Sequence, residues 1–154
     1  MPSSPIRTVV SFTSTAFNKT EHRSYFINKG CFGDDVAKWL IGELRENGVN
    51  ADREPGQEDF GWYFNFVVGE KAHTFVIGYR PGDEKDEEGT WIGWIERDRG
   101  LFGSIFRARK RGIDPLAIWA IHSILSVSPK VQDVRWHCQQ DFDKGREELG
   151  TPAP

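Results

Sequence analysis

Apolar and polar residues alternate most regularly between residues 62 and 79, and this pattern predicts a β-hairpin. Trp62, Phe64 and Phe66 fall on alternate positions before Gly69 and Glu70, a pair that suits a two-residue type II′ turn. A turn of two residues fixes the register of the strands, and therefore which residues share a face. The face expected to form the core consists of Trp62, Phe64, Phe66, His73, Phe75, Ile77 and Tyr79.

The same alternation predicts strands over residues 6–12, 90–97 and 131–137, with a short extended piece at 25–27. The strand at 90–97 is apolar on both faces, because Trp91 and Ile95 alternate with Ile92 and Trp94. Both faces of this part of the sheet therefore need a cover.

Two segments have the period of a helix. The first, over residues 34–47, carries a buried stripe at Val36, Ala37, Leu40, Ile41 and Leu44. Asp34 is its expected N-cap, and Gly48 its left-handed stop. The second helix covers 116–127 after an Asp114 N-cap and Pro115, and because it is almost entirely apolar we expect it to be deeply packed.

These elements give the order β-α-β-β-β-α-β, which predicts an α+β fold: a two-layer sandwich of an antiparallel β-meander and two helices. A chain of 154 residues corresponds to one domain, 1–154, with order expected over about 6–142. Between the elements we expect acidic loops at 52–59 and 83–88 and a basic amphipathic segment at 97–112. The polar tail at 145–154 is expected to fray.

Charge and composition exclude several classes of protein. The formal net charge of −3 argues against a nucleic-acid binder, so we expect the basic segment to bind no specific nucleic acid. No apolar run approaches 18 residues, so no membrane span is expected. The first residues lack a signal-peptide pattern and there are only two cysteines, which together favour a reduced, cytoplasmic setting. Six Trp and eleven Phe form an aromatic surplus that suits either the core or a binding face.

No pattern specific to a reaction is present. Two candidate sites are Cys31 with His137 as its base, and a metal cluster of His137, Cys138, Asp141 and Asp143. The first is opposed by the neighbouring Asp34 and Asp35, and the second lacks a further spaced pair of ligands. The glycines around Cys31 match no phosphate loop, Glu58 and Asp59 fit a turn better than a carboxylate dyad, and His73 and His122 fit the core. We therefore predict no catalytic residue, no metal and no cofactor.

The chain resembles a group of small, uncharacterised bacterial proteins. The resemblance lies in INKGCFGDDVAKWL (27–40), EPGQEDFGWYF (54–64) and WIGWIER (91–97), where an acidic loop precedes a Gly-Trp pair. It spans most of residues 8–140. It implies a bacterial single-domain protein and supplies no catalytic residue.

The pattern favours a non-enzymatic interaction domain, of the kind that neutralises a toxin, with an aromatic sheet face and acidic loops engaging a protein partner. The alternative is a small hydrolase or ligand-binding enzyme with a pocket near the Glu58-Asp59-Trp62 loop. The expected binding residues are Gln57, Glu58, Asp59, Trp62, Tyr63, Ile92, Trp94 and Arg97. Tyr63, Val67, Val76, Ile92 and Trp94 would share the second sheet face, and we predict a homodimer through that face.

Overall fold

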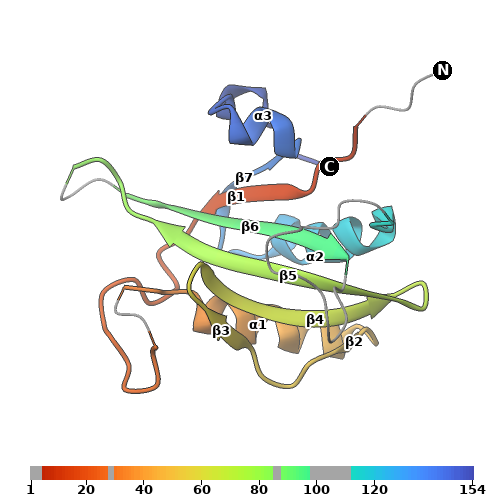
Figure 1. The fold of residues 1–154 in the computed structure, drawn as a ribbon, viewed down its shortest axis with the longest axis horizontal. Coiled ribbons are helices and arrows are strands. Elements are labelled where there is room, and N and C mark those ends of the chain that lie inside the picture. Colours follow the sequence, from red (N-terminus) through yellow and green to blue (C-terminus); the bar gives the residue numbers. More distant parts are fainter. Residues whose placement is uncertain (1–4, 28–29, 85–87, 98–111) are drawn as a thin grey trace.

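One antiparallel sheet of seven strands organises the molecule, with α1 and α2 against one of its faces (Figure 1). The computed structural model of the protein describes residues 5–27, 30–84, 88–97 and 112–154. The strands are β1 (Val9–Thr13), β2 (Asn50–Ala51), β3 (Gly56–Glu58), β4 (Gly61–Val68), β5 (Lys71–Arg80), β6 (Thr90–Arg97) and β7 (Gln132–His137). The helices are α1 (Asp34–Glu46), α2 (Pro115–Val127), α3 (Gln139–Asp143) and the 3₁₀ turn η1 (Glu147–Leu149). The α+β sandwich expected from the sequence is confirmed.

Sheet order follows β2-β4-β5-β6-β1-β7, with β3 paired to β4. The β4-β5 hairpin has the expected register, since Phe64 lies opposite Phe75, and β6 continues the meander with Ile95 opposite Phe75. The face predicted to be the core is buried, with Tyr79 half-buried at its edge. The first strand of the chain, β1, lies between β6 and β7. The N-terminal and C-terminal strands are therefore neighbours at one edge of the sheet.

Both long helices pack their apolar residues on this core face. The stripe of α1 is buried as expected, but Gly33 is the N-cap and Asp34 stands in the first turn. The Asp34 side chain makes no cap, and its carboxylate instead accepts a hydrogen bond from the Tyr25 hydroxyl. In α2, the Asp114 side chain accepts a hydrogen bond from the Leu116 N–H at 2.9 Å, so the predicted cap is confirmed.

Buried histidines join α2 to the sheet. His73 Nδ1 lies 2.9 Å from the Lys71 carbonyl, and its Nε2 accepts the Asp114 N–H at 3.0 Å. His122 Nδ1 accepts from the Trp136 indole N–H at 3.0 Å. The expectation that these two histidines belong to the core is therefore confirmed.

Four local expectations were wrong. The hairpin turn has positive φ at both Gly69 (59°) and Glu70 (63°), which makes it type I′ rather than II′. The loop expected before Trp62 contains the short strands β2 and β3, because β4 is long enough to pair with both. Residues 25–27 form a turn and a bend instead of an extended piece. Finally, α2 is not buried all round, since Leu116, Trp119 and Val127 are exposed.

The expected fraying of the tail was also wrong. This part of the chain contains α3 and η1, and Thr151 pairs with Trp136. Arg80 forms an ion pair with Glu147 at 2.7 Å, and the Arg7 guanidinium donates a hydrogen bond to the Leu149 carbonyl at 3.2 Å. This C-terminal segment lies beside β7 and β1 (Figure 1).

The second sheet face is partly closed along the described residues. Val76 is fully buried, Tyr63, Ile92 and Trp94 are half-buried, and Val67 is 37% exposed. The exposed apolar surface on this face is therefore smaller than the contiguous open patch on which the homodimer prediction was based. Dimerisation through this face stays a prediction. The acidic run at 83–88 is described only in part, and the basic segment at 97–112 lies outside the described residues except at its two ends.

Candidate functional site

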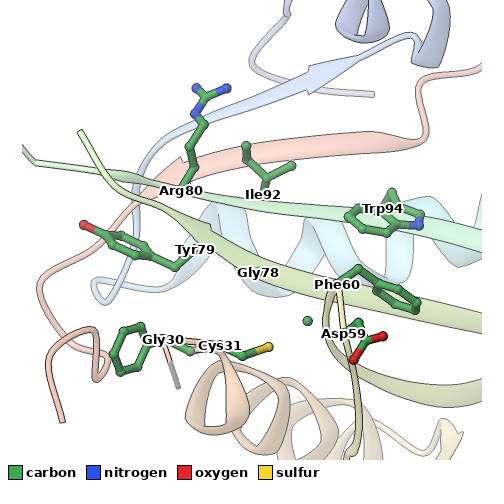
Figure 2. Close-up of a pocket in the computed structure, with 11 residues that line it drawn as sticks. Gly30, Cys31, Asp59, Phe60, Gly78, Tyr79, Arg80, Ile92 and Trp94 are labelled. Atoms are coloured by element: carbon green, nitrogen blue, oxygen red, sulfur yellow. The ribbon is translucent and has the colours of Figure 1, made fainter. Parts of the chain in front are cut away.

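A pocket of about 580 Å³ opens between the 30–32 loop, the β3–β4 turn, the end of β5 and the first half of β6 (Figure 2). Its walls are aromatic and apolar at Phe60, Ile92 and Trp94, and polar at Cys31, Asp59 and Arg80. The volume is in the range of pockets that take small ligands or a few side chains of a partner. The full lining is Gly30, Cys31, Phe32, Asp59, Phe60, Gly61, Gly78, Tyr79, Arg80, Ile92 and Trp94.

Glycine at position 61 sets the shape of this pocket. Glu58 pairs with Gly61, so Asp59 and Phe60 form the two-residue turn between β3 and β4. Gly61 has φ 153°, and a Cβ there would lie 2.4 Å from the Ile77 carbonyl oxygen. The bare backbone at this point lets the turn lie directly on β5, and so presents Asp59 and Phe60 to the pocket.

Hydrogen bonds from β3 and β4 position the segment that leads into the 30–32 loop on the other side of the pocket. The Gln57 side chain accepts from the Ile27 N–H at 2.6 Å and donates to the Tyr25 carbonyl at 3.0 Å. The Trp62 indole N–H donates to the Cys31 carbonyl at 2.7 Å. Gln57 and Trp62 therefore position the wall without lining the pocket.

Phe60 and Trp94 form the aromatic part of the wall. Their ring centroids are 6.0 Å apart with planes tilted by 45°, and Phe60 is 40% exposed. The Trp94 indole N–H donates to the Glu96 carboxylate at 2.8 Å, which fixes the orientation of the ring. Two oriented, partly exposed rings offer contact area at a low cost in side-chain entropy.

The Cys31 thiol lies on the side of the pocket facing Asp59 (Figure 2) and donates to the Glu58 carbonyl at 3.7 Å. Burial raises the pKa of the thiol, and the negative charge of Asp59 raises it further. The neutral thiol is therefore the dominant form near pH 7. This opposes a nucleophilic role, because the thiolate is the reactive species.

Replacing Asp59 by Asn tests this electrostatic effect. We expect wild-type Cys31 to react with iodoacetamide at pH 7.5 several-fold more slowly than a free cysteine peptide. Asp59→Asn should speed the reaction a few-fold, since removal of the negative charge lowers the thiol pKa. Mass spectrometry of the alkylated tryptic peptide measures both rates, with buried Cys138 as the internal control. A slower reaction in the variant would contradict the assignment.

The structure brings together only part of the predicted binding set. Asp59, Ile92 and Trp94 line the pocket. Gln57 and Trp62 brace it, and Glu58 contributes a backbone carbonyl. Two residues lie elsewhere: Tyr63 packs beside Gly56, and Arg97 donates to the Ala72 carbonyl at the other end of β5. Phe60, Tyr79 and Arg80 also line the pocket, but the sequence analysis did not predict them as binding residues. Of the three, only Phe60 could have been suspected from the sequence, because a large aromatic residue stands in a turn.

A second polar cluster lies on β1 and β7. Ser11 Oγ and His137 Nε2 are 2.8 Å apart, at the edge of a pocket of about 370 Å³ that Arg135 and Glu147 also line. Burial lowers the His137 pKa, so the ring is neutral near pH 7. However, Ser11 lies in the middle of β1, which pairs with β6 on one side and with β7 on the other. The backbone N–H groups near Ser11 are therefore used in the sheet, and they cannot stabilise an oxyanion. The pair is better explained as the anchor of the C-terminal segment.

His137 also does not reach Cys31, since it bonds to Ser11 and packs on Phe142. No group of three or more His, Cys, Asp or Glu side chains with metal-binding geometry is found within the described residues, which include His137, Cys138, Asp141 and Asp143. Among the same residues, no helix is long and apolar enough to cross a membrane.

Comparison with known proteins adds no functional assignment. No protein-family model matches this chain, and neither the curated protein sequences nor the solved structures contain a significant match. The pocket must therefore be interpreted from its own chemistry.

Proposed function

We propose that the protein is a non-enzymatic interaction domain that seats an apolar or aromatic side chain of a basic protein partner in the pocket. The observation that carries the proposal is the Phe60–Trp94 ring pair, which stands partly exposed on a pocket wall beside Asp59. Oriented aromatic rings are frequent binding hot spots, and a carboxylate at the rim favours a positively charged partner.

The case for a basic partner rests on Asp59 at the pocket and on the acidic segment that leads to it, because the charge of Arg80, which also lines the pocket, is offset by its ion pair with Glu147 at 2.7 Å. Residues 52–59 carry Asp52, Glu54, Glu58 and Asp59 against Arg53. A like surface on the partner would be repelled, whereas Lys or Arg side chains would be attracted during encounter. The immunity-type role suggested by the sequence is one example of such an interaction.

The alternative, a hydrolase at this pocket, receives less support from the side chains. Glu58 is not among the residues that line this pocket, so a carboxylate pair of Glu58 and Asp59 receives no support here. The neutral Cys31 thiol is a weak nucleophile. Binding without chemistry is the use that the pocket fits better.

Selection of random 12-residue peptides displayed on phage tests the proposal. We expect the selected peptides to combine an aromatic or large apolar residue with Lys or Arg, because these complement Trp94 and Asp59. Synthetic copies of the peptides should bind Trp94→Ala at least tenfold more weakly than the wild type, a loss typical of a binding hot spot.

Trp119→Ala is the matched control. Trp119 is 48% exposed on α2 and is remote from the pocket, so this variant should keep wild-type affinity. Selected peptides that bind Trp94→Ala as tightly as the wild type, or that carry net negative charge, would show that the proposal is wrong.

A further inference from the structure

The C-terminal segment, residues 139–151, reaches the candidate pocket through one ion pair. Arg80, at the end of β5, lines the pocket, and Glu147 lies in η1, 67 positions later in the chain. The Arg80 guanidinium donates to both oxygens of the Glu147 carboxylate, at 2.7 and 3.2 Å. In Figure 2 the Arg80 side chain points away from Cys31 and Asp59. The positive charge of this wall residue is therefore held by the C-terminal segment.

The ion pair stands between two hollows on the second sheet face. Arg80 and Ile92 line the candidate pocket, whereas Ser11 and Glu147 line the hollow of about 370 Å³ beside it. Ile92 lies opposite Ser11 in the ladder of β6 and β1, so the two hollows are neighbours. A partner seated in the candidate pocket therefore meets Glu147 at the rim.

Contacts of the neighbouring backbone fix the position of Glu147. Arg7 donates to the Leu149 carbonyl at 3.2 Å. Gly150 packs on His137, where a Cβ at Gly150 would lie 2.5 Å from the ring. These contacts do not involve the Glu147 side chain, and an ion pair between side chains as exposed as these adds little stability. Replacing the Glu147 side chain should therefore leave the segment in place.

The sign of the charge that the pocket presents depends on this pair. Among the described residues that line the pocket, the formal charges near pH 7 belong to Asp59 and Arg80, which have opposite sign. Without Glu147, the guanidinium of Arg80 would oppose the attraction of a cation to the pocket. The hydrogen bond from Arg80 lowers the pKa of Glu147, so the carboxylate that cancels this guanidinium stays ionised through the neutral range.

We infer that Glu147 is a specificity-determining residue of the pocket, because it cancels the Arg80 charge that would otherwise repel a basic partner. The inference rests on the proposed function for the kind of partner, but the electrostatic effect of Glu147 is measurable without any partner. In water, a unit charge about 10 Å away changes the local concentration of a charged reagent by about twofold.

Alkylation of Cys31 by a charged and a neutral reagent tests the inference, because this thiol lines the same pocket. Iodoacetate is an anion and iodoacetamide is neutral, but both react with the thiolate, so the ratio of their rates removes any change in the Cys31 pKa. We expect Glu147→Gln to raise the iodoacetate-to-iodoacetamide ratio about twofold, and Arg80→Gln to lower it by a similar factor. The double variant should return close to the wild-type ratio. Mass spectrometry of the Cys31 peptide measures both rates.

Glu148→Gln is the matched control, since it removes the same charge from the exposed neighbour of Glu147 in η1. It should leave the ratio at the wild-type value. An unchanged ratio in Glu147→Gln, an equal rise in Glu148→Gln, or a rise that persists in the double variant would overturn the inference. Circular dichroism checks the fold, and the lower ratio expected for Arg80→Gln decides the matter even if Glu147→Gln does not fold.

Peptide binding separates this inference from the proposed function. The peptides selected on the wild type should bind Glu147→Gln several-fold more weakly than Glu148→Gln, because the Arg80 charge is then no longer cancelled. Equal binding to the two variants would overturn the inference. If no peptide binds the wild type, the proposed function is wrong, and the ratio of alkylation rates still decides whether Glu147 sets the charge of the pocket.

Discussion

Lowering the pH from 7 to 5 is expected to destabilise the folded protein steeply. Burial lowers the pKa of His73, His122 and His137 below the ordinary value of 6.5. Each imidazole is therefore neutral in the folded state at pH values where the unfolded chain already binds a proton. Stability is fully present above about pH 6.5 and is lost as the pH falls toward the folded-state pKa values, by about 1.4 kcal/mol per pH unit for each proton taken up on unfolding.

Hydrogen bonds accepted by two of these rings act in the same direction as burial. His73 Nε2 accepts the Asp114 N–H and His122 Nδ1 accepts the Trp136 indole N–H, so a proton on either nitrogen would break the bond. His137 is surrounded by Arg7, Arg80 and Arg135, which also disfavour its charged form, while Glu147 opposes them. Urea unfolding at half-unit steps of pH measures the effect.

His122→Gln provides the specific check on this prediction. The Gln carbonyl can still accept from Trp136, so the variant should fold while its stability falls less steeply between pH 6.5 and 5. Asp35, whose pKa is raised by burial, changes stability in the opposite direction but at lower pH. A wild-type stability that stays flat from pH 7 to 5 would contradict the assignment of neutral buried rings.

Gly61→Ala is expected to destabilise the protein by at least about 3 kcal/mol. The new Cβ would lie 2.4 Å from the Ile77 carbonyl oxygen, a backbone atom that cannot move without disturbing β5. The φ of 153° adds strain for any residue with a side chain. Because the turn that carries Asp59 and Phe60 must lift away from β5, binding at the pocket should be lost together with stability.

Gly42→Ala is the matched control, measured in the same urea titrations of tryptophan fluorescence. Gly42 lies in α1, and a Cβ at this position would have no neighbour within 4 Å, so the change should stabilise the helix by up to about 1 kcal/mol. Equal stabilities for Gly61→Ala and the wild type would show that the turn does not lie on β5 as described.

The sequence alone determined those elements that depend on residues close together in the chain. The hairpin of β4 and β5, the strand β6, the stripe of α1 and the Asp114 cap of α2 all follow from alternation, helical spacing or one side chain. The turn type did not follow. Gly69 packs so close to Asp114, which is far away in the sequence, that a Cβ at Gly69 would lie 2.7 Å from the Asp114 carboxylate. In this turn the φ of Glu70 is positive as well as that of Gly69, which the residues of the turn alone did not indicate.

Tertiary structure alone decided how the candidate site is assembled. Cys31, Asp59, Tyr79 and Trp94 come from four separate segments, and no local pattern states that these segments meet at one end of the sheet. The insertion of β1 between β6 and β7 likewise joins Ser11 to His137, 126 positions later. The physical reason is that periodicity reports which face of an element is buried, whereas strand order and long-range packing report what lies against that face.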